Sequence, residues 1–142
     1  MSAQPRATIR VKHRYTASAE RVFDAWLDRE RAGKWLFATP TGHMVRVEID
    51  ARVGGKFIFT RRDGEDVDHV GEYLEIDRPR RLVFTFSVPK YSTESTRVTI
   101  EIVPAGSGCE LTLTHELVLP EWESGTASGW AMILDNLSKT VD

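Results

Sequence analysis

His115 is the residue whose sequence pattern best suits it to polar chemistry inside the fold. It shares the apolar face of an alternating strand with Leu111, Leu113 and Leu117, so its imidazole is predicted to point inward. A histidine titrates near neutral pH, so it could contact a ligand or relay a proton. The alternative is a hydrogen-bonded core histidine, which we favour over catalysis because titratable residues mark functional sites only statistically. His13 has the same inward register near the end of the first strand.

Aromatic side chains form the second group that could build a binding site. Trp35 ends a predicted short helix and Trp130 begins the apolar stripe of the last helix, so each could wall a cavity and offer an indole N–H. Tyr73 lies between Glu72 and Glu75, where an inward carboxylate would be a general base or a polar anchor, although such carboxylates usually face water. The predicted ligand-binding residues are Trp35, Phe57, Phe59, Tyr73, Phe84, His115 and Trp130.

Each candidate motif for metal binding or nucleophilic catalysis lacks a residue that it requires. Cys109 is the only cysteine, so neither an intrachain disulfide nor a cysteine-based zinc site is expected. His115-Glu116 lacks the second histidine that a zinc-protease helix requires. An acidic cluster at a hairpin turn lacks the later glutamate of a calcium loop; its members are Asp63, Glu65, Asp66 and Asp68. We therefore predict no catalytic residue, no metal and no cofactor.

Length and charge narrow the class of protein. The 142 residues predict one domain, residues 1–142. A chain of that length can bury a hydrophobic core without needing disulfide bonds or a structural metal to fold. A formal net charge of -2 argues against nucleic acid as the main partner, because phosphate binding needs a basic surplus. No apolar run approaches the roughly 20 residues of a membrane span, and residues 1–6 lack the apolar core of a signal peptide. A cytoplasmic location is the default expectation.

Changes in hydrophobic period predict the elements that position these side chains. Residues Thr8–Tyr15 alternate between apolar and polar, which predicts a half-buried strand. The same alternation predicts six further strands, and for one of them, His69–Ile76, parity does not assign the inward face. After Pro120 the period becomes 3.6, which predicts a helix from about Ser124 to Val141.

Two short helices are predicted between the first and second strands. Ser18 can cap a helix from Ala19 to about Leu27, and Asp28 can cap a second helix that reaches Leu36. A seven-stranded sheet with one polar face must bury its other face, and only the terminal helix is long enough to fill that side. This order predicts an α+β helix-grip fold, in which a curved antiparallel sheet wraps around the C-terminal helix and leaves a cavity between them.

Several short motifs stand in a fixed order between Ile9 and Val141. They are Val22-Phe23-Asp24-Ala25-Trp26, Lys34-Trp35, Asp50-Ala51-Arg52-Val53-Gly54-Gly55-Lys56-Phe57, Gly71-Glu72-Tyr73-Leu74-Glu75-Ile76, Leu113-Thr114-His115 and Gly129-Trp130. Their order resembles the START-like, birch-pollen-allergen-like superfamily (SRPBCC), and within it the family named for the C-terminal domain of the heat-shock protein 90 ATPase activator. The resemblance implies a helix-grip domain over nearly the whole chain, with an internal ligand cavity.

The resemblance and the supply of aromatic residues favour a binding module for a small apolar or lipid-like molecule. Two rival functions stay open: an enzyme acting on the bound ligand, like cyclases and hydrolases of the superfamily, and an interaction module for a chaperone ATPase. The chaperone role ranks lower because the predicted outer face of the sheet is mixed polar and because the chaperone activators carry a further N-terminal domain. A homodimer is left open.

Overall fold

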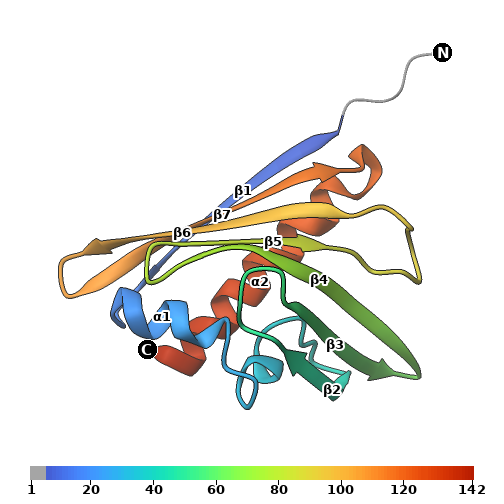
Figure 1. Cartoon of the computed structure of the whole chain (residues 1–142), viewed down its shortest axis with the longest axis horizontal. Coiled ribbons are helices and arrows are strands. Elements are labelled where there is room, and N and C mark those ends of the chain that lie inside the picture. The colour runs from blue at the N-terminus through green and yellow to red at the C-terminus, as the bar shows by residue number, and fades with distance from the viewer. Residues whose placement is uncertain (1–5) are drawn as a thin grey trace.

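Seven antiparallel strands form the framework that carries the site, and the computed structural model describes residues 6–142. The strands are β1 (Ala7–Tyr15), β2 (His43–Ile49), β3 (Lys56–Asp63), β4 (Glu65–Asp77), β5 (Arg81–Phe86), β6 (Thr96–Ala105) and β7 (Gly108–Val118). They are hydrogen-bonded in the order β1-β7-β6-β5-β4-β3-β2, so β1 and β2 are the two edges (Figure 1). This confirms the predicted helix-grip fold of the α+β class.

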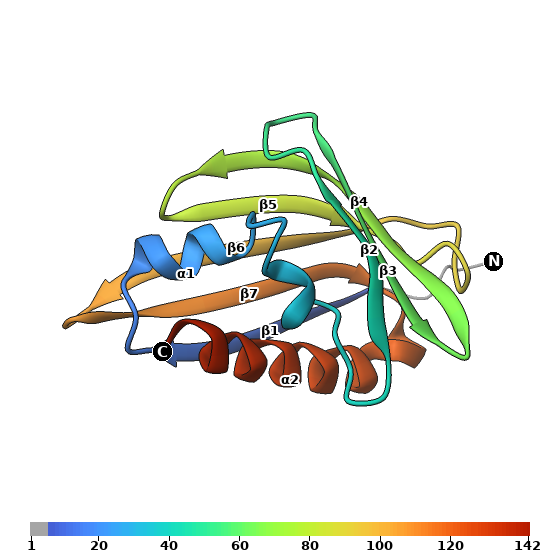
Figure 2. The same ribbon diagram turned by 90° about the horizontal axis from the view of Figure 1, so that it is seen from below.

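The long C-terminal helix α2 (Glu123–Val141) crosses the concave side of the sheet (Figure 2). Its buried stripe is Trp130, Ile133, Leu134, Leu137 and Val141. The hydroxyl of Tyr15 donates a hydrogen bond to the carbonyl of Leu134 at 2.9 Å. The carboxylate of Asp142 accepts from the backbone N–H groups of Thr16 and Ala17. These contacts tie the helix to the end of β1, and they confirm the predicted position of the helix.

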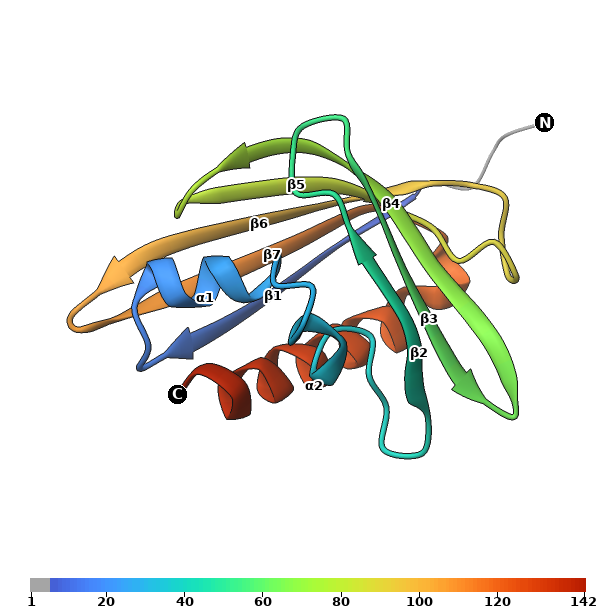
Figure 3. The ribbon, with the colours of Figure 1, turned by 60° about the horizontal axis from the view of Figure 1, so that its bottom comes forward.

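Two short helical elements follow β1. Ser18 caps α1 (Ala19–Ala25) by accepting a hydrogen bond from the backbone N–H of Arg21 at 3.2 Å, as predicted. The second element is shorter than predicted, because only the 3-10 turn η1 (Ala32–Lys34) forms within the stretch expected to be helical. A second 3-10 turn, η2 (Pro120–Trp122), leads directly into α2. Figure 3 shows α1 and η1 on the same side of the sheet as α2.

A β-bulge explains why parity does not assign the inward face of β4. The pairing of β4 with β5 shifts register between Tyr73 and Glu75. Before the bulge, His69 and Tyr73 are buried at odd positions, whereas Ile76 packs against the core at an even position after it. The extra residue of a bulge reverses the alternation, so a single parity cannot hold along this strand.

The outer face of the sheet carries cross-strand ion pairs. Arg97 on β6 pairs with Glu116 on β7 at 2.9 Å, and Arg81 on β5 pairs with Glu101 on β6 at 3.2 Å. Such exposed pairs contribute little to stability, but they keep this face polar and leave the concave side as the place for a binding site. No helix within residues 6–142 is long and apolar enough to cross a membrane.

Candidate functional site

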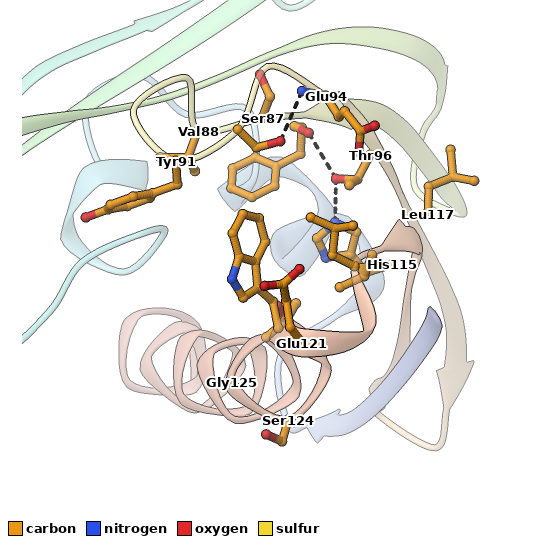
Figure 4. Close-up of a pocket in the computed structure, with 16 residues that line it drawn as sticks. Ser87, Val88, Tyr91, Glu94, Thr96, His115, Leu117, Glu121, Ser124 and Gly125 are labelled. Atoms are coloured by element: carbon orange, nitrogen blue, oxygen red, sulfur yellow. Dashed lines mark hydrogen bonds between the residues drawn. The ribbon is translucent and has the colours of Figure 1, made fainter. Parts of the chain in front are cut away.

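A hollow opens at one end of the sheet, beside the N-terminal turn of α2. Its volume is about 610 Å³. It lies between the segment 87–95 that joins β5 to β6, the end of β7, and residues 119–126, and we call it the mouth pocket (Figure 4). It is lined by Phe86, Ser87, Val88, Tyr91, Ser92, Glu94, Thr96, His115, Leu117, Val118, Leu119, Glu121, Trp122, Ser124, Gly125 and Thr126.

A directional chain of hydrogen bonds runs beneath this pocket. The indole Nε1–H of Trp130 donates to Nδ1 of His115 at 2.9 Å. Nε2 of His115 lies 2.6 Å from Oγ1 of Thr96, and the Thr96 hydroxyl donates to the carbonyl of Phe86 at 2.9 Å. Because Nδ1 must accept and the only hydroxyl hydrogen of Thr96 is committed to Phe86, the ring proton of His115 must reside on Nε2. His115 is therefore a neutral imidazole with both nitrogens engaged.

Burial reinforces the neutral state of His115. The residue is only 3% exposed, and desolvation by burial lowers its pKa to about 4. A second proton would have to sit on Nδ1, where it would face the N–H of Trp130. At neutral pH the histidine thus serves as a fixed polar element in the pocket floor, which matches the hydrogen-bonded alternative raised from the sequence.

The rim of the mouth pocket is apolar and acidic. Leu117 is 52% exposed and has a positive φ of 69°, a conformation that leucine rarely adopts. Glu94 pairs with Arg6 at 2.8 Å, and Glu121 is a second glutamate of the lining. Figure 4 shows the carboxylate of Glu121 directed towards the other lining side chains. The lining contains two carboxylates and no lysine or arginine, so its electrostatic character disfavours an anion.

The space between strands β3 to β5 and the segment 26–37 is almost filled. A void of only about 10 Å³ remains there, which leaves room for at most one water-sized molecule. It is lined by Trp26, Leu36, Phe37, Phe57, Phe59, Tyr73, Leu82 and Phe84. The ring of Phe37 supplies much of this filling, because it packs against both Phe57 and Phe59.

The seven residues predicted from the sequence fall into separate groups in the structure. His115 lines the mouth pocket, and Trp130 lies behind it as its hydrogen-bond donor. Four others surround the interior void: Phe57, Phe59, Tyr73 and Phe84. Trp35 lines neither space; it is fully buried and meets Trp26 edge to face with 4.8 Å between ring centroids.

Several residues around these spaces were not singled out from the sequence. Tyr91 and Trp122 are exposed aromatic residues at the rim, and exposure of large apolar residues beside a hollow is a signal of binding only once the fold is known. Thr96 reads in the sequence as an ordinary strand residue. Phe37 reads as a loop residue, and its positive φ of 60° has no sequence signature.

No group of three or more His, Cys, Asp or Glu side chains is arranged to hold a metal ion in the part of the chain that the structure describes. The remaining buried histidine, His69, donates from Nδ1 to the carbonyl of Phe59 at 3.2 Å and stacks on Phe37. Burial lowers its pKa to about 4 as well. The chemistry that the two histidines support is therefore hydrogen bonding in the neutral form.

Comparison with known proteins gives a family and many structural relatives. The family model described as "Activator of Hsp90 ATPase homolog 1-like protein" matches residues 16–142. A crystal structure of a protein from Chromobacterium violaceum is 28% identical, with a TM-score of 0.87, and covers 94% of this chain and 96% of its own.

Two further relatives share the fold at lower identity. CalU16 from Micromonospora echinospora is 24% identical with a TM-score of 0.74, over 95% of this chain and 76% of its own. The AHSA1-like protein from Aeromonas hydrophila is 21% identical with a TM-score of 0.80, and the match covers 94% of this chain and 90% of that protein. No curated protein matches the chain significantly.

Proposed function

The chain belongs to the family of activator of Hsp90 ATPase homolog 1-like proteins, and from this premise we propose that it binds a small, mostly apolar, uncharged molecule in the mouth pocket. The family fold is of a ligand-binding type, which supports a binding role in general terms. The ligand, and the place where it binds, are our inference from the geometry of this chain.

The observation that carries the proposal is the size and lining of the mouth pocket. Its volume of about 610 Å³ falls within the roughly 300–1,000 Å³ of small-molecule sites. Such sites combine apolar walls with a few fixed polar groups. Here Phe86, Leu117 and Trp122 offer apolar surface, while Thr96 and His115 are held in place by their hydrogen bonds.

The charge of the lining supports a neutral ligand over a fatty acid or a phosphate ester. A buried anion needs a positive partner or dedicated donors. The lining has no lysine or arginine, and the N–H of His115 is already committed to Thr96. An anion would also lie near Glu121, so we expect an uncharged molecule to bind more tightly than a carboxylate of equal length.

The test is a titration of ¹⁵N-labelled protein with 2-hexanone, a short neutral ketone, followed by two-dimensional NMR. We expect the backbone signals of Thr96, His115 and Leu117 to shift, and hexanoate to shift them less. The same experiment on Leu117→Asp places a charge in the pocket, and its affinity should fall at least roughly tenfold, equivalent to about 1.4 kcal/mol. Aspartate tolerates positive φ better than leucine, so this variant should remain folded.

The matched control is Val103→Asp. Val103 is also an exposed apolar strand residue, 62% accessible, but it lines none of the hollows described above. Its affinity for the ketone should equal that of the wild type. Equal binding by both aspartate variants, or ketone-induced shifts only at distant residues, would contradict the proposed site. Native mass spectrometry of protein from its own host would then identify the natural ligand.

A further inference from the structure

The two edges of the sheet present their charges differently. β1 and β2 are the terminal strands, so within residues 6–142 each has one side without a strand partner. Such an edge is a template for pairing with another chain, and proteins often protect it with charged side chains. On β1 the exposed charged residues are all positive: Arg10, Lys12 and Arg14. On β2 they have opposite signs, since they are Arg46 and Glu48, and each side chain is more than half exposed.

The backbone of β2 directs hydrogen-bonding groups outward at alternate residues. The N–H of Asp50 donates to the carbonyl of Lys56 at 3.0 Å, which makes these two residues a hydrogen-bonded pair. In an antiparallel ladder such pairs alternate with pairs whose N–H and C=O groups point away from the partner strand. Val47 is three residues from Asp50 in an unbroken register, so its backbone groups point away from β3. Figure 1 shows β2 at the lower margin of the sheet, where these groups face away from the other strands.

A second copy of β2 fits this edge in an antiparallel register centred on Val47. With Val47 opposite its counterpart, the two residues exchange their outward N–H and C=O groups across a two-fold axis. The same register places Arg46 of each copy opposite Glu48 of the other. These become non-hydrogen-bonded pairs, in which the Cα atoms are only about 4.5 Å apart and the side chains interact most closely. Backbone and charge therefore favour the same register.

Neighbouring registers lose one of these two matches. With Ile49 on the axis, Glu48 would lie opposite Asp50, and two carboxylates would repel. With Glu48 on the axis, two glutamates would face each other, and the alternation of the ladder directs the backbone groups of this residue to β3. On β1 the exposed basic side chains of two copies would face each other, so that edge disfavours a copy.

We propose that two copies of this chain associate through β2, paired antiparallel about a two-fold axis at Val47, so that their sheets become one continuous sheet. Arg46 and Glu48 already form an ion pair within one chain, and each gains a second neighbour of opposite sign from the other copy. The interface of two short strands is small, which predicts a weak dimer that salt dissociates. The lining of the mouth pocket lies outside β2, so the dimer is independent of the proposed binding function.

The experiment is sedimentation equilibrium over a series of protein concentrations, at low and high salt. Arg46→Glu leaves only carboxylates around the axis, and Glu48→Arg leaves only guanidinium groups. Each single variant should raise the dissociation constant of the dimer at least roughly tenfold, because juxtaposed like charges oppose association. The double variant Arg46→Glu/Glu48→Arg exchanges the two signs and should restore the wild-type constant. Both side chains are exposed, so the variants should fold as the wild type does.

The matched control is Lys12→Glu, which reverses an exposed charge on the opposite edge of the sheet. It should leave the dissociation constant at the wild-type value, because β1 takes no part in the proposed pairing. The salt dependence should be strong for the wild type and for the double variant, since both carry opposite charges at the axis.

NMR of a mixture of ¹³C-labelled and unlabelled protein reads the register directly. Residues 46 and 48 of one strand are two rises apart, or roughly 6.6 Å, whereas Arg46 and Glu48 of different copies face each other across the axis. We therefore expect a nuclear Overhauser effect between the α-proton of Arg46 in one copy and that of Glu48 in the other. The amide of Val47 should also exchange with deuterium more slowly as the protein concentration rises.

Three results would overturn the inference. The first is a wild-type protein that stays monomeric up to the millimolar concentrations of the NMR sample. The second is a dimer that both charge reversals leave intact, or that the double variant fails to restore. The third is a dimer that Lys12→Glu disrupts, which would place the interface on β1. In each case the ketone titration still decides the mouth pocket separately.

Discussion

Acidification from pH 7 to pH 5 should destabilise this protein through two buried histidines. Burial lowers the pKa of both His115 and His69 to about 4 in the folded state. In the unfolded chain a histidine has its ordinary pKa of about 6.5. The unfolded state therefore binds protons first as the pH falls, so this part of the stability is fully present above about pH 6.5 and is lost between there and pH 4.

The magnitude follows from the two pKa values of each histidine. The difference between the unfolded pKa of about 6.5 and the folded pKa of about 4 corresponds to a loss of about 3 kcal/mol in the free energy of unfolding, once the pH is below both pKa values. Between pH 7 and pH 5 about 2 kcal/mol of this is lost per histidine, or about 4 kcal/mol for the pair. That is a large part of the roughly 5–15 kcal/mol that stabilises a typical domain. Side-chain hydrogen bonds from Arg78 and Arg97 lower the pKa values of Asp24 and Glu116, so these carboxylates act at lower pH, outside this window.

The assay is urea unfolding at pH 7, 6 and 5, followed by tryptophan fluorescence, for the wild type and His115→Gln. Glutamine can accept from Trp130 and donate to Thr96, and it does not titrate in this range. The variant should therefore lose about 2 kcal/mol less than the wild type over the same interval. If the two proteins lose equal stability, His115 does not carry the proposed linkage. A His115 ring that titrates above pH 6 by NMR would refute the argument independently.

Three further substitutions test other contacts. Trp130→Phe keeps an aromatic ring on α2 but leaves Nδ1 of His115 without its donor, so thermal unfolding should show a loss of about 1–3 kcal/mol. Phe37→Gly should be more stable than Phe37→Ala by about 1 kcal/mol in the same assay, reversing the usual order, because only glycine adopts the φ of 60° freely. Gly71→Ala should lower the free energy of unfolding by several kcal/mol, as other overpacked core changes do. The added Cβ would lie 1.9 Å from the carbonyl oxygen of Thr85 and 2.5 Å from the ring of Phe57. A loss below about 0.5 kcal/mol, typical of surface changes, would contradict this packing.

The fold could be predicted because its signals are local and repeated. Alternation in β1 and β7, the cap at Ser18 and the 3.6-residue period after Pro120 each depend on residues close together in the sequence. The stretch 28–36 shows the limit of such signals. A cap at Asp28 predicts a helix that reaches Leu36, but the structure forms only the turn Ala32–Lys34.

The candidate site was harder to predict because it depends on contacts between distant segments. The inward direction of His115 follows from the alternation of β7, and burial confirms it. Its partners do not follow from any pattern, since Thr96 and Trp130 lie 19 and 15 residues away. The mouth pocket is likewise bounded by a β5–β6 connection and by the entry to α2, neither of which has a regular period.

The distinction between pocket wall and filled core has the same physical origin. Phe57, Phe59 and Phe84 alternate inward on their strands whether the space before them is open or occupied, so sequence pattern alone cannot separate the two cases. Phe37, a residue outside the sheet, decides whether that space is open or filled. Its backbone has a positive φ, and its ring packs against Phe57 and Phe59. The interior volume of this fold is thus set by one irregular segment against a regular framework.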